Sequence, residues 1–109
     1  MQRLVKTLHL KDDAELIRQY CDIHDNIWPE IREGIKDVGI DSMDIYLHGN
    51  LAVMIVEMAD NLDSEKVFAR LATLPRQQEW EEYVARFQEC DKDNTSAEKW
   101  KPMQRIFKL

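Results

Sequence analysis

An apolar run, Leu51–Met58, lies in the middle of this 109-residue chain and follows the turn-forming tripeptide His48-Gly49-Asn50. A glycine turn between two segments of strand character is typical of a β-hairpin, so Ser42–Leu47 and Leu51–Met58 are predicted to pair. The second of these strands is almost entirely apolar, which predicts a central, buried position. Further strands are predicted near the two ends of the chain, at Arg3–Leu10 and Met103–Leu109.

Two helices are predicted between the first strand and the hairpin. Asp12, followed three residues later by Glu15, resembles a capping box and indicates a helix that reaches about Trp28. Pro29 disfavours helical backbone at the preceding residue but suits a first helical position, so a second helix is predicted after a bend. Gly39 closes this second helix in the manner of a C-cap.

After the hairpin, the sequence predicts two more helices and a loop. Asp63 and Ser64 can cap the first of these helices, and Pro75 suits the start of the second. The polar, turn-rich stretch from Cys90 to Lys101 is predicted to be a surface loop, which includes the acidic run Asp91–Asn94. The last predicted strand follows this loop.

The resulting order of strand, helix, strand, strand, helix and strand is that of the split βαβ or ferredoxin-like architecture. We therefore predict an α+β fold in a single domain over residues 1–109, with an antiparallel sheet and helices on one face. The other face of the sheet then lacks a helical cover. A second copy packing sheet to sheet would bury that face and enclose a pocket, so a homodimer, a dimeric α/β barrel, is expected.

Composition and charge exclude several classes of function. The 21 acidic and 15 basic residues give a net charge of −6 and are interspersed, which argues against a nucleic-acid partner. The apolar runs are far shorter than the roughly 20 residues of a membrane span, and no signal-peptide pattern is found, so a cytoplasmic location without membrane contact is expected. Cys21-x-x-His24 has no second Cys/His pair, so no metal site is predicted.

Tyr20, His24 and Trp28 recur every four residues and therefore share one face of the first predicted helix. Histidine suits proton transfer near neutral pH, because its unperturbed pKa is about 6.5, and the two aromatic rings can lie against a polyol ring. Aromatic residues at helical spacing are more often core residues, and the spacing alone favours a structural role for all three.

The segment from His24 to Glu30, HDNIWPE, resembles the L-rhamnose mutarotase family, whose helix carries a Tyr, then a His four residues later, then a run of the type N-x-W-P-E. The likeness covers nearly the whole chain. It continues through Asp44-Ile45-Tyr46-Leu47 and Glu57, and through Gln78-x-Trp80-x-x-Tyr83 on the late helix.

The resemblance implies a cofactor-free enzyme that interconverts the α and β anomers of a deoxyhexose, with a dimeric ferredoxin-like fold. It gives His24 the role of acid and base at the sugar ring. It also places six other residues at the sugar, namely Tyr20, Trp28, Met43, Tyr46, Trp80 and Glu81. The ring opens when its oxygen gains a proton and the anomeric hydroxyl loses one, which requires neither a metal nor a redox step.

Two of these positions differ from the pattern of the rhamnose enzyme. Met43 stands where that enzyme has a substrate-contacting tyrosine, and Glu81 stands where it has a second consecutive tryptophan. Both changes alter sugar contacts and leave the proton-transfer residue in place, so the sugar is predicted to be L-rhamnose or L-fucose. The counterpart base stays open among Tyr20, Tyr46, Glu57, Glu81 and a water molecule.

Two other functions fit a dimeric ferredoxin-like fold of this length, because fold alone does not decide function. One is that of a cofactor-independent monooxygenase, and the other is that of a non-catalytic sugar-binding module. The run from His24 to Glu30 favours a mutarotase over a monooxygenase, and His24 itself distinguishes an enzyme from a binding module.

Overall fold

The computed structural model describes residues 1–90 and 96–109. The predicted loop run Asp91–Asn94 lies outside these residues. The elements in chain order are β1 (Gln2–His9), α1 (Ala14–Asp25), α2 (Pro29–Asp37), β2 (Ile40–His48), β3 (Leu51–Met58), α3 (Ser64–Leu71), α4 (Gln77–Ala85), α5 (Ser96–Lys99) and β4 (Lys101–Pro102).

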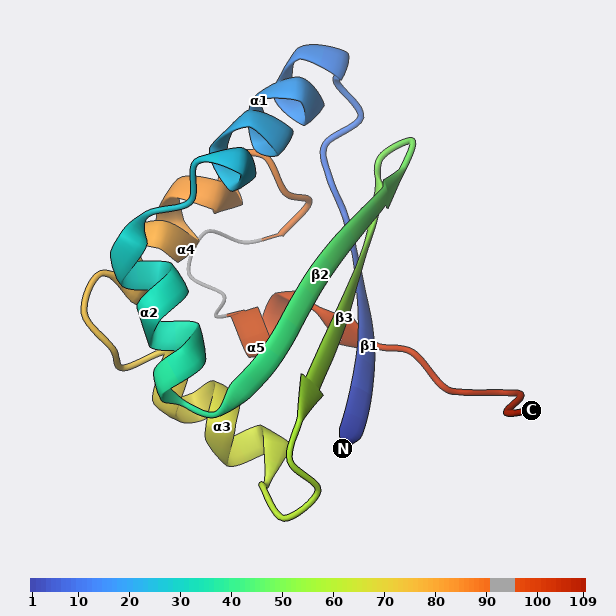
Figure 1. Ribbon diagram of the computed structural model, residues 1–109. Coiled ribbons are helices and arrows are strands. Elements are labelled where there is room, and N and C mark those ends of the chain that lie inside the picture. Colours follow the sequence, from blue (N-terminus) through green and yellow to red (C-terminus); the bar gives the residue numbers. More distant parts are fainter. Residues whose placement is uncertain (91–95) are drawn as a thin grey trace.

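The four strands form one antiparallel sheet in the order β2-β3-β1-β4. β3 pairs with both β1 and β2, so the predicted hairpin and the central position of its second strand are confirmed. Gly49 makes the hairpin turn with a φ of 60°, which a residue with a Cβ adopts rarely. The helices of the described chain lie on one face of the sheet (Figure 1), and the α+β, ferredoxin-like prediction is confirmed.

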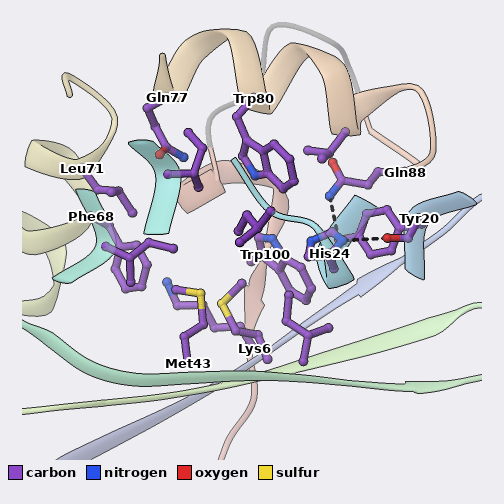
Figure 2. Close-up of a pocket in the computed structure, with 16 residues that line it drawn as sticks. Lys6, Tyr20, His24, Met43, Phe68, Leu71, Gln77, Trp80, Gln88 and Trp100 are labelled. Atoms are coloured by element: carbon purple, nitrogen blue, oxygen red, sulfur yellow. Dashed lines mark hydrogen bonds between the residues drawn. The ribbon is translucent and has the colours of Figure 1, made fainter. Parts of the chain in front are cut away.

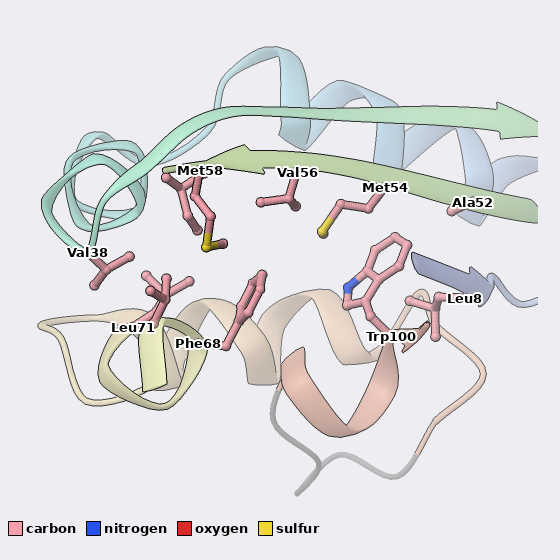
Figure 3. Packing of buried hydrophobic residues seen from close by; sticks show 11 residues of the cluster. Leu8, Val38, Ala52, Met54, Val56, Met58, Phe68, Leu71 and Trp100 are labelled. Atoms are coloured by element: carbon pink, nitrogen blue, oxygen red, sulfur yellow. The ribbon is translucent and has the colours of Figure 1, made fainter. Parts of the chain in front are cut away.

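Side chains alternate between the two faces of a strand, and this alternation decides where the core lies. The face toward the helices, here called the inner face, carries Val56 and Met58 of β3, both fully buried. Phe68 and Leu71 of α3 pack against them (Figure 3). This cluster needs no second chain to exclude water.

The opposite face of the sheet, here called the outer face, has no helix over it (Figure 1). Val53 and Ile55 of β3 and Val5 of β1 point to this side and are half-buried. Tyr46 of β2 lies beside Val53 and is 61% exposed. An apolar sheet face is thus left in contact with solvent in the isolated chain.

The bounds of the first helix differ from the prediction at both ends. The N-cap is Asp13, not Asp12, because Asp13 has extended backbone and its carboxylate accepts a hydrogen bond from the amide of Leu16 at 3.0 Å. α1 ends at Asp25 and does not reach Trp28, whose extended conformation follows from the proline after it.

The later helices follow the prediction in part. Pro29 opens α2, Gly39 follows its end with a φ of 100°, and Asp63 caps α3, all as predicted. Pro75 does not open α4, which begins at Gln77. Arg76 precedes it in the left-handed conformation with a φ of 65°, so the proline lies in the turn before the helix.

The C-terminal part of the chain differs most from the prediction. Within the predicted surface loop, α5 forms and Trp100 is only 4% exposed, packed in the core beside Leu8 and Met54 (Figure 3). β4 covers only two residues, so Met103–Leu109 is not the predicted strand. The tail after Met103 makes no ladder with its own sheet, and Phe107 is 75% exposed.

Candidate active site

A cavity lies between the inner face of the sheet and helices α1, α2 and α4 (Figure 2). About 620 Å³ of space free of protein atoms lies between its lining residues and in the open solvent at its mouth. Tyr20, His24, Met43 and Trp80, four of the seven predicted site residues, line it. A second, more open hollow of about 920 Å³ shares His24 and Met43 with the cavity and extends along β2.

His24 lies in the last turn of α1 and is held in one tautomer. Its Nδ1 is 2.7 Å from the backbone carbonyl of Tyr20, which only accepts hydrogen bonds, so Nδ1 carries a proton. In the neutral ring, Nε2 is therefore unprotonated. Burial lowers the pKa of His24, although the bond to the Tyr20 carbonyl opposes this change, so the neutral form is favoured near pH 7.

Aromatic rings surround the imidazole. The Tyr20 ring lies with its centroid 4.3 Å away, and the Trp80 ring meets the imidazole edge to face at 5.4 Å. Phe87 packs on the far side of Tyr20 at 6.2 Å. These contacts fix the ring of His24 and give the cavity flat apolar walls of the kind that lie against the C–H faces of a sugar.

Tyr20 is 4% exposed, and its hydroxyl contacts another buried residue of the cavity lining. Its oxygen is 3.3 Å from Nε2 of Gln88, a residue that is itself 2% exposed. Oε1 of Gln88 accepts a hydrogen bond from the ammonium group of Lys99 at 3.2 Å. Burial raises the pKa of Tyr20 to about 12, so the phenol is protonated at neutral pH.

The sheet forms the opposite wall of the cavity (Figure 2). Met43 of β2 and Lys6 of β1 point inward from it, and the Lys6 ammonium lies 3.8 Å from the centroid of the Phe68 ring. Burial lowers the pKa of Lys6. The lysine thus brings a hydrogen-bond donor to a wall that is otherwise apolar.

Three predicted sugar-contacting residues do not line this cavity. Trp28 lies behind Trp80, with its ring edge-to-face at 5.2 Å, and stacks on Tyr83 at 5.7 Å. Glu81 is 6% exposed and accepts a hydrogen bond from Gln77 at 3.4 Å. Tyr46 belongs to the outer face of the sheet, because Met43 of the same strand points inward and Tyr46 lies three residues further on.

Besides Tyr46, the outer face holds a second candidate base, Glu57. Glu57 lies opposite Arg3 on β1, with 3.6 Å between the carboxylate and the guanidinium, and accepts a hydrogen bond from Ser42 at 3.5 Å. The sheet separates both Glu57 and Tyr46 from His24. Within one chain, neither is placed to exchange a proton with a ligand of the cavity.

No group of three or more His, Cys, Asp or Glu side chains in the described residues is placed to hold a metal ion. Cys21 and Cys90 form no disulfide in this part of the chain. In residues 1–90 and 96–109, no helix is both long and apolar enough to cross a membrane.

Several residues at the site were not predicted from the sequence. Lys6 shares its strand face with Leu4 and Leu8, so a lysine on an apolar face was a usable signal. Gln88 lies eight residues after Trp80, which is two helical intervals of four residues, and this spacing was a weaker signal. No signal in the sequence pointed to Lys99, because its segment carries no regular apolar pattern.

Comparison with known proteins points to one family. A model described as L-rhamnose mutarotase matches residues 3–109. An L-fucose mutarotase of Xanthomonas campestris pv. campestris is 38% identical over 111 residues, which cover 100% of this chain and 89% of that protein. A UPF0734 protein of Dictyostelium discoideum is 32% identical over 95% of this chain and 86% of its own length.

Two solved structures share the fold. The crystal structure of an L-rhamnose mutarotase from Formosa agariphila has a TM-score of 0.76 and 18% identity, covering 100% of this chain and 99% of that chain. The tetracenomycin F2 cyclase of Streptomyces glaucescens has a TM-score of 0.61 and 17% identity over the same shares of the two chains. At these identities the likeness shows the fold alone.

Proposed function

Because the chain belongs to the L-rhamnose mutarotase family and is therefore a sugar mutarotase, an isomerase, we propose that it interconverts the anomers of L-fucose with His24 as the acid and base. The observation that carries the residue assignment is the geometry of His24 in the cavity, with Nδ1 tied to the Tyr20 carbonyl and Nε2 left unprotonated. The family match favours this function over the monooxygenase and binding-module alternatives.

L-fucose is the proposed sugar for two reasons. The L-fucose mutarotase of Xanthomonas campestris is 38% identical to this chain along its whole length. In addition, Met43 lines the cavity where the rhamnose enzyme's pattern has a tyrosine. A thioether cannot donate the hydrogen bond that a phenol gives to a sugar hydroxyl. We therefore expect this cavity to recognise a different arrangement of hydroxyl groups from the one that L-rhamnose presents.

The proposed reaction starts with a neutral His24. Nε2 removes the proton of the anomeric hydroxyl while the bond between C1 and the ring oxygen breaks, and the imidazolium returns that proton to the ring oxygen. The open-chain aldehyde turns about C1–C2 and closes on its other face by the reverse transfers. The imidazole ends as it began, so no further reactant is consumed.

Saturation-transfer NMR of anomer exchange tests the substrate. With wild-type protein, exchange between the α and β anomers is expected to be faster for L-fucose than for L-rhamnose, and slowest for D-glucose at equal concentration. Heat-inactivated protein is the control for uncatalysed exchange. Faster exchange of L-rhamnose than of L-fucose would contradict the proposed sugar. Exchange that is no faster than in the control, for every sugar, would contradict the proposed mutarotase activity.

We further propose that two copies associate through the outer face of the sheet. That face exposes the apolar centre formed by Val5, Val53 and Ile55, and the tail beyond it exposes Ile106 and Phe107 at 91% and 75%. A second copy covers both at once, because a two-fold axis lets each chain offer its own tail and sheet to the other. Burial of these surfaces also gives the tail a partner that its own sheet does not provide.

Sedimentation velocity tests this association. Wild-type protein is expected to sediment as a dimer at micromolar concentration, and Val53→Lys is expected to sediment as a monomer, because it places a charge in the centre of the interface. Lys66→Glu, at an exposed residue of α3 on the helical side of the sheet, is the charge-change control and should remain dimeric. A monomeric wild-type protein would contradict the association.

A further inference from the structure

A buried lysine lies behind the cavity and takes no part in the proton transfer proposed above. Lys99 is 4% exposed, and its ammonium group donates to the backbone carbonyl of Glu81 at 3.1 Å and to Oε1 of Gln88 at 3.2 Å. Burial lowers the pKa of Lys99. Burying an ammonium group costs free energy unless its protons are hydrogen-bonded, so Lys99 can be buried here only because these two carbonyl oxygens accept from it.

Lys99 determines which way the Gln88 amide points. An ammonium group only donates hydrogen bonds, so the amide oxygen must face it. The thiol of Cys90 approaches the same oxygen at 3.8 Å. The amide nitrogen therefore faces the other way, where Nε2 lies 3.3 Å from the Tyr20 hydroxyl. A reversed amide would set its NH₂ group against the ammonium, donor against donor.

The backbone holds Gln88 in place for this contact. The amide of Glu89 donates to the carbonyl of His9 at 2.9 Å, and the amide of Lys11 donates to the carbonyl of Phe87 at 2.9 Å. These bonds tie both neighbours of Gln88 to the end of β1 and the turn after it. The side chain therefore starts from a fixed point, and its direction depends on Lys99.

The amide in turn determines how the Tyr20 hydroxyl is used. The NH₂ group only donates, so the phenol oxygen accepts from Gln88 and the phenol proton points elsewhere. Tyr20 and His24 line the same cavity (Figure 2). The phenol, protonated at neutral pH, is left as a hydrogen-bond donor toward a ligand in that cavity.

We propose that Lys99 and Gln88 are positioning residues that orient the Tyr20 hydroxyl, so that it donates to the ring oxygen of the sugar as the ring opens. The inference rests on the proposed function and deepens it, because it removes Tyr20 from the candidate bases. Negative charge develops on the ring oxygen when its bond to C1 breaks. A donor that is already oriented stabilises this charge without reorganisation.

Gln88→Glu separates an orienting role from a structural one. The new carboxylate pairs with Lys99, so the fold is expected to keep its melting temperature. A carboxylate only accepts hydrogen bonds, however, and turns the Tyr20 proton away from the cavity. With L-fucose as the probe, kcat is expected to fall by about tenfold or more, as for a lost transition-state donor, while KM stays within about twofold.

Two lysine variants complete the test. Lys99→Met frees the amide to turn, and a smaller fall in kcat is expected. Lys101→Met removes an exposed lysine that donates to the carbonyl of Glu98 at 2.9 Å and does not line the cavity, and kcat should be unchanged. If Lys99→Met does not fold, Gln88→Glu decides alone.

The outcomes distinguish this inference from the proposed function. An unchanged kcat in Gln88→Glu, with wild-type protein active on L-fucose, would overturn the positioning role of Lys99 and Gln88 and leave the mutarotase assignment intact. A rise in KM with unchanged kcat would also overturn it, because the contact would then act on binding alone. Wild-type protein that accelerates no sugar would contradict the function itself.

Discussion

The inner and outer faces of the sheet are built from the same strands and similar residues, yet they meet different surroundings. Val56 on the inner face of β3 is fully buried by the chain's own helices. Val53, three residues earlier on the same strand, lies on the outer face and is only half-buried. The difference shows that one chain completes its core and its cavity, and leaves one apolar sheet face uncovered.

The cavity belongs wholly to the covered face. His24 and Tyr20 reach it from α1, Trp80 reaches it from α4, and Met43 reaches it from β2. Tyr46 and Glu57 lie on the outer face and are separated from His24 by the sheet, whereas Glu81 is buried on α4. We therefore expect substitutions on the inner face to change the reaction rate. Substitutions on the outer face should change association and stability instead.

The largest effect is expected from His24→Gln. Loss of a general acid and base slows the reaction by on the order of 10²–10⁴-fold, and glutamine keeps a hydrogen-bonding side chain of similar length. Tyr46→Phe, on the outer face, is the matched control and should leave the exchange rate of L-fucose unchanged. Saturation-transfer NMR measures both variants, and a strong loss in Tyr46→Phe would break the division between the two faces.

A smaller effect is expected from the same substitution made on each face of β3. Val56→Ala removes two buried methyl groups at about 0.8 kcal/mol each and leaves a cavity, so the free energy of unfolding should fall by about 2 kcal/mol. This loss should not depend on protein concentration. In the proposed dimer Val53 packs against a second copy, so the loss of unfolding free energy in Val53→Ala should be smaller at low protein concentration and larger at high concentration. Urea unfolding at two protein concentrations measures both.

The smallest effect is expected from Glu57→Gln. This substitution breaks the exposed ion pair with Arg3, and such pairs contribute about 0–1 kcal/mol to stability. The exchange rate of L-fucose should not change, because the carboxylate lies on the outer face. A loss of activity as large as that of His24→Gln would identify Glu57 as the base. The reaction would then take place on the outer face, which would contradict this account.

Local chemistry explains why the order of strands and helices could be predicted. Gly49 and Gly39 mark a turn and a helix end with positive φ, Pro29 opens a helix, and Asp63 caps one. Each of these signals acts within a few residues of the chain. The nearly continuous apolar run Leu51–Met58 predicted a central strand, and the pairing of β3 with both neighbours confirmed it.

The C-terminal segment could not be predicted in the same way, because its structure depends on distant contacts. Trp100 stands in a polar stretch and becomes part of the core only through β1 and β3. Lys99 enters the site because Glu81 and Gln88 offer acceptors far away in the sequence. The alternating pattern of Met103–Leu109 predicted a strand, and this was wrong, because the chain's own sheet gives the segment no ladder beyond Pro102.

The site was predictable where a helix brings residues together. Tyr20 and His24 share a turn of α1, and their ring contact follows from the spacing of four. Tyr46 lies apart from this group, on the outer face, and the pairing of β2 with β3 shows this face whereas the resemblance does not. Which of the lining residues contact the sugar stays a prediction.

The pH dependence of L-fucose exchange, measured beside an NMR titration of the His24 ring, tests the central claim that neutral His24 starts the reaction. Burial lowers the pKa of His24, so both midpoints are expected to coincide below about 6.5. Because the neutral ring is the base, the enzyme-dependent rate should rise with pH through that midpoint and then stay level. A rate that falls as His24 loses its proton, or that does not respond to its titration, would contradict the account.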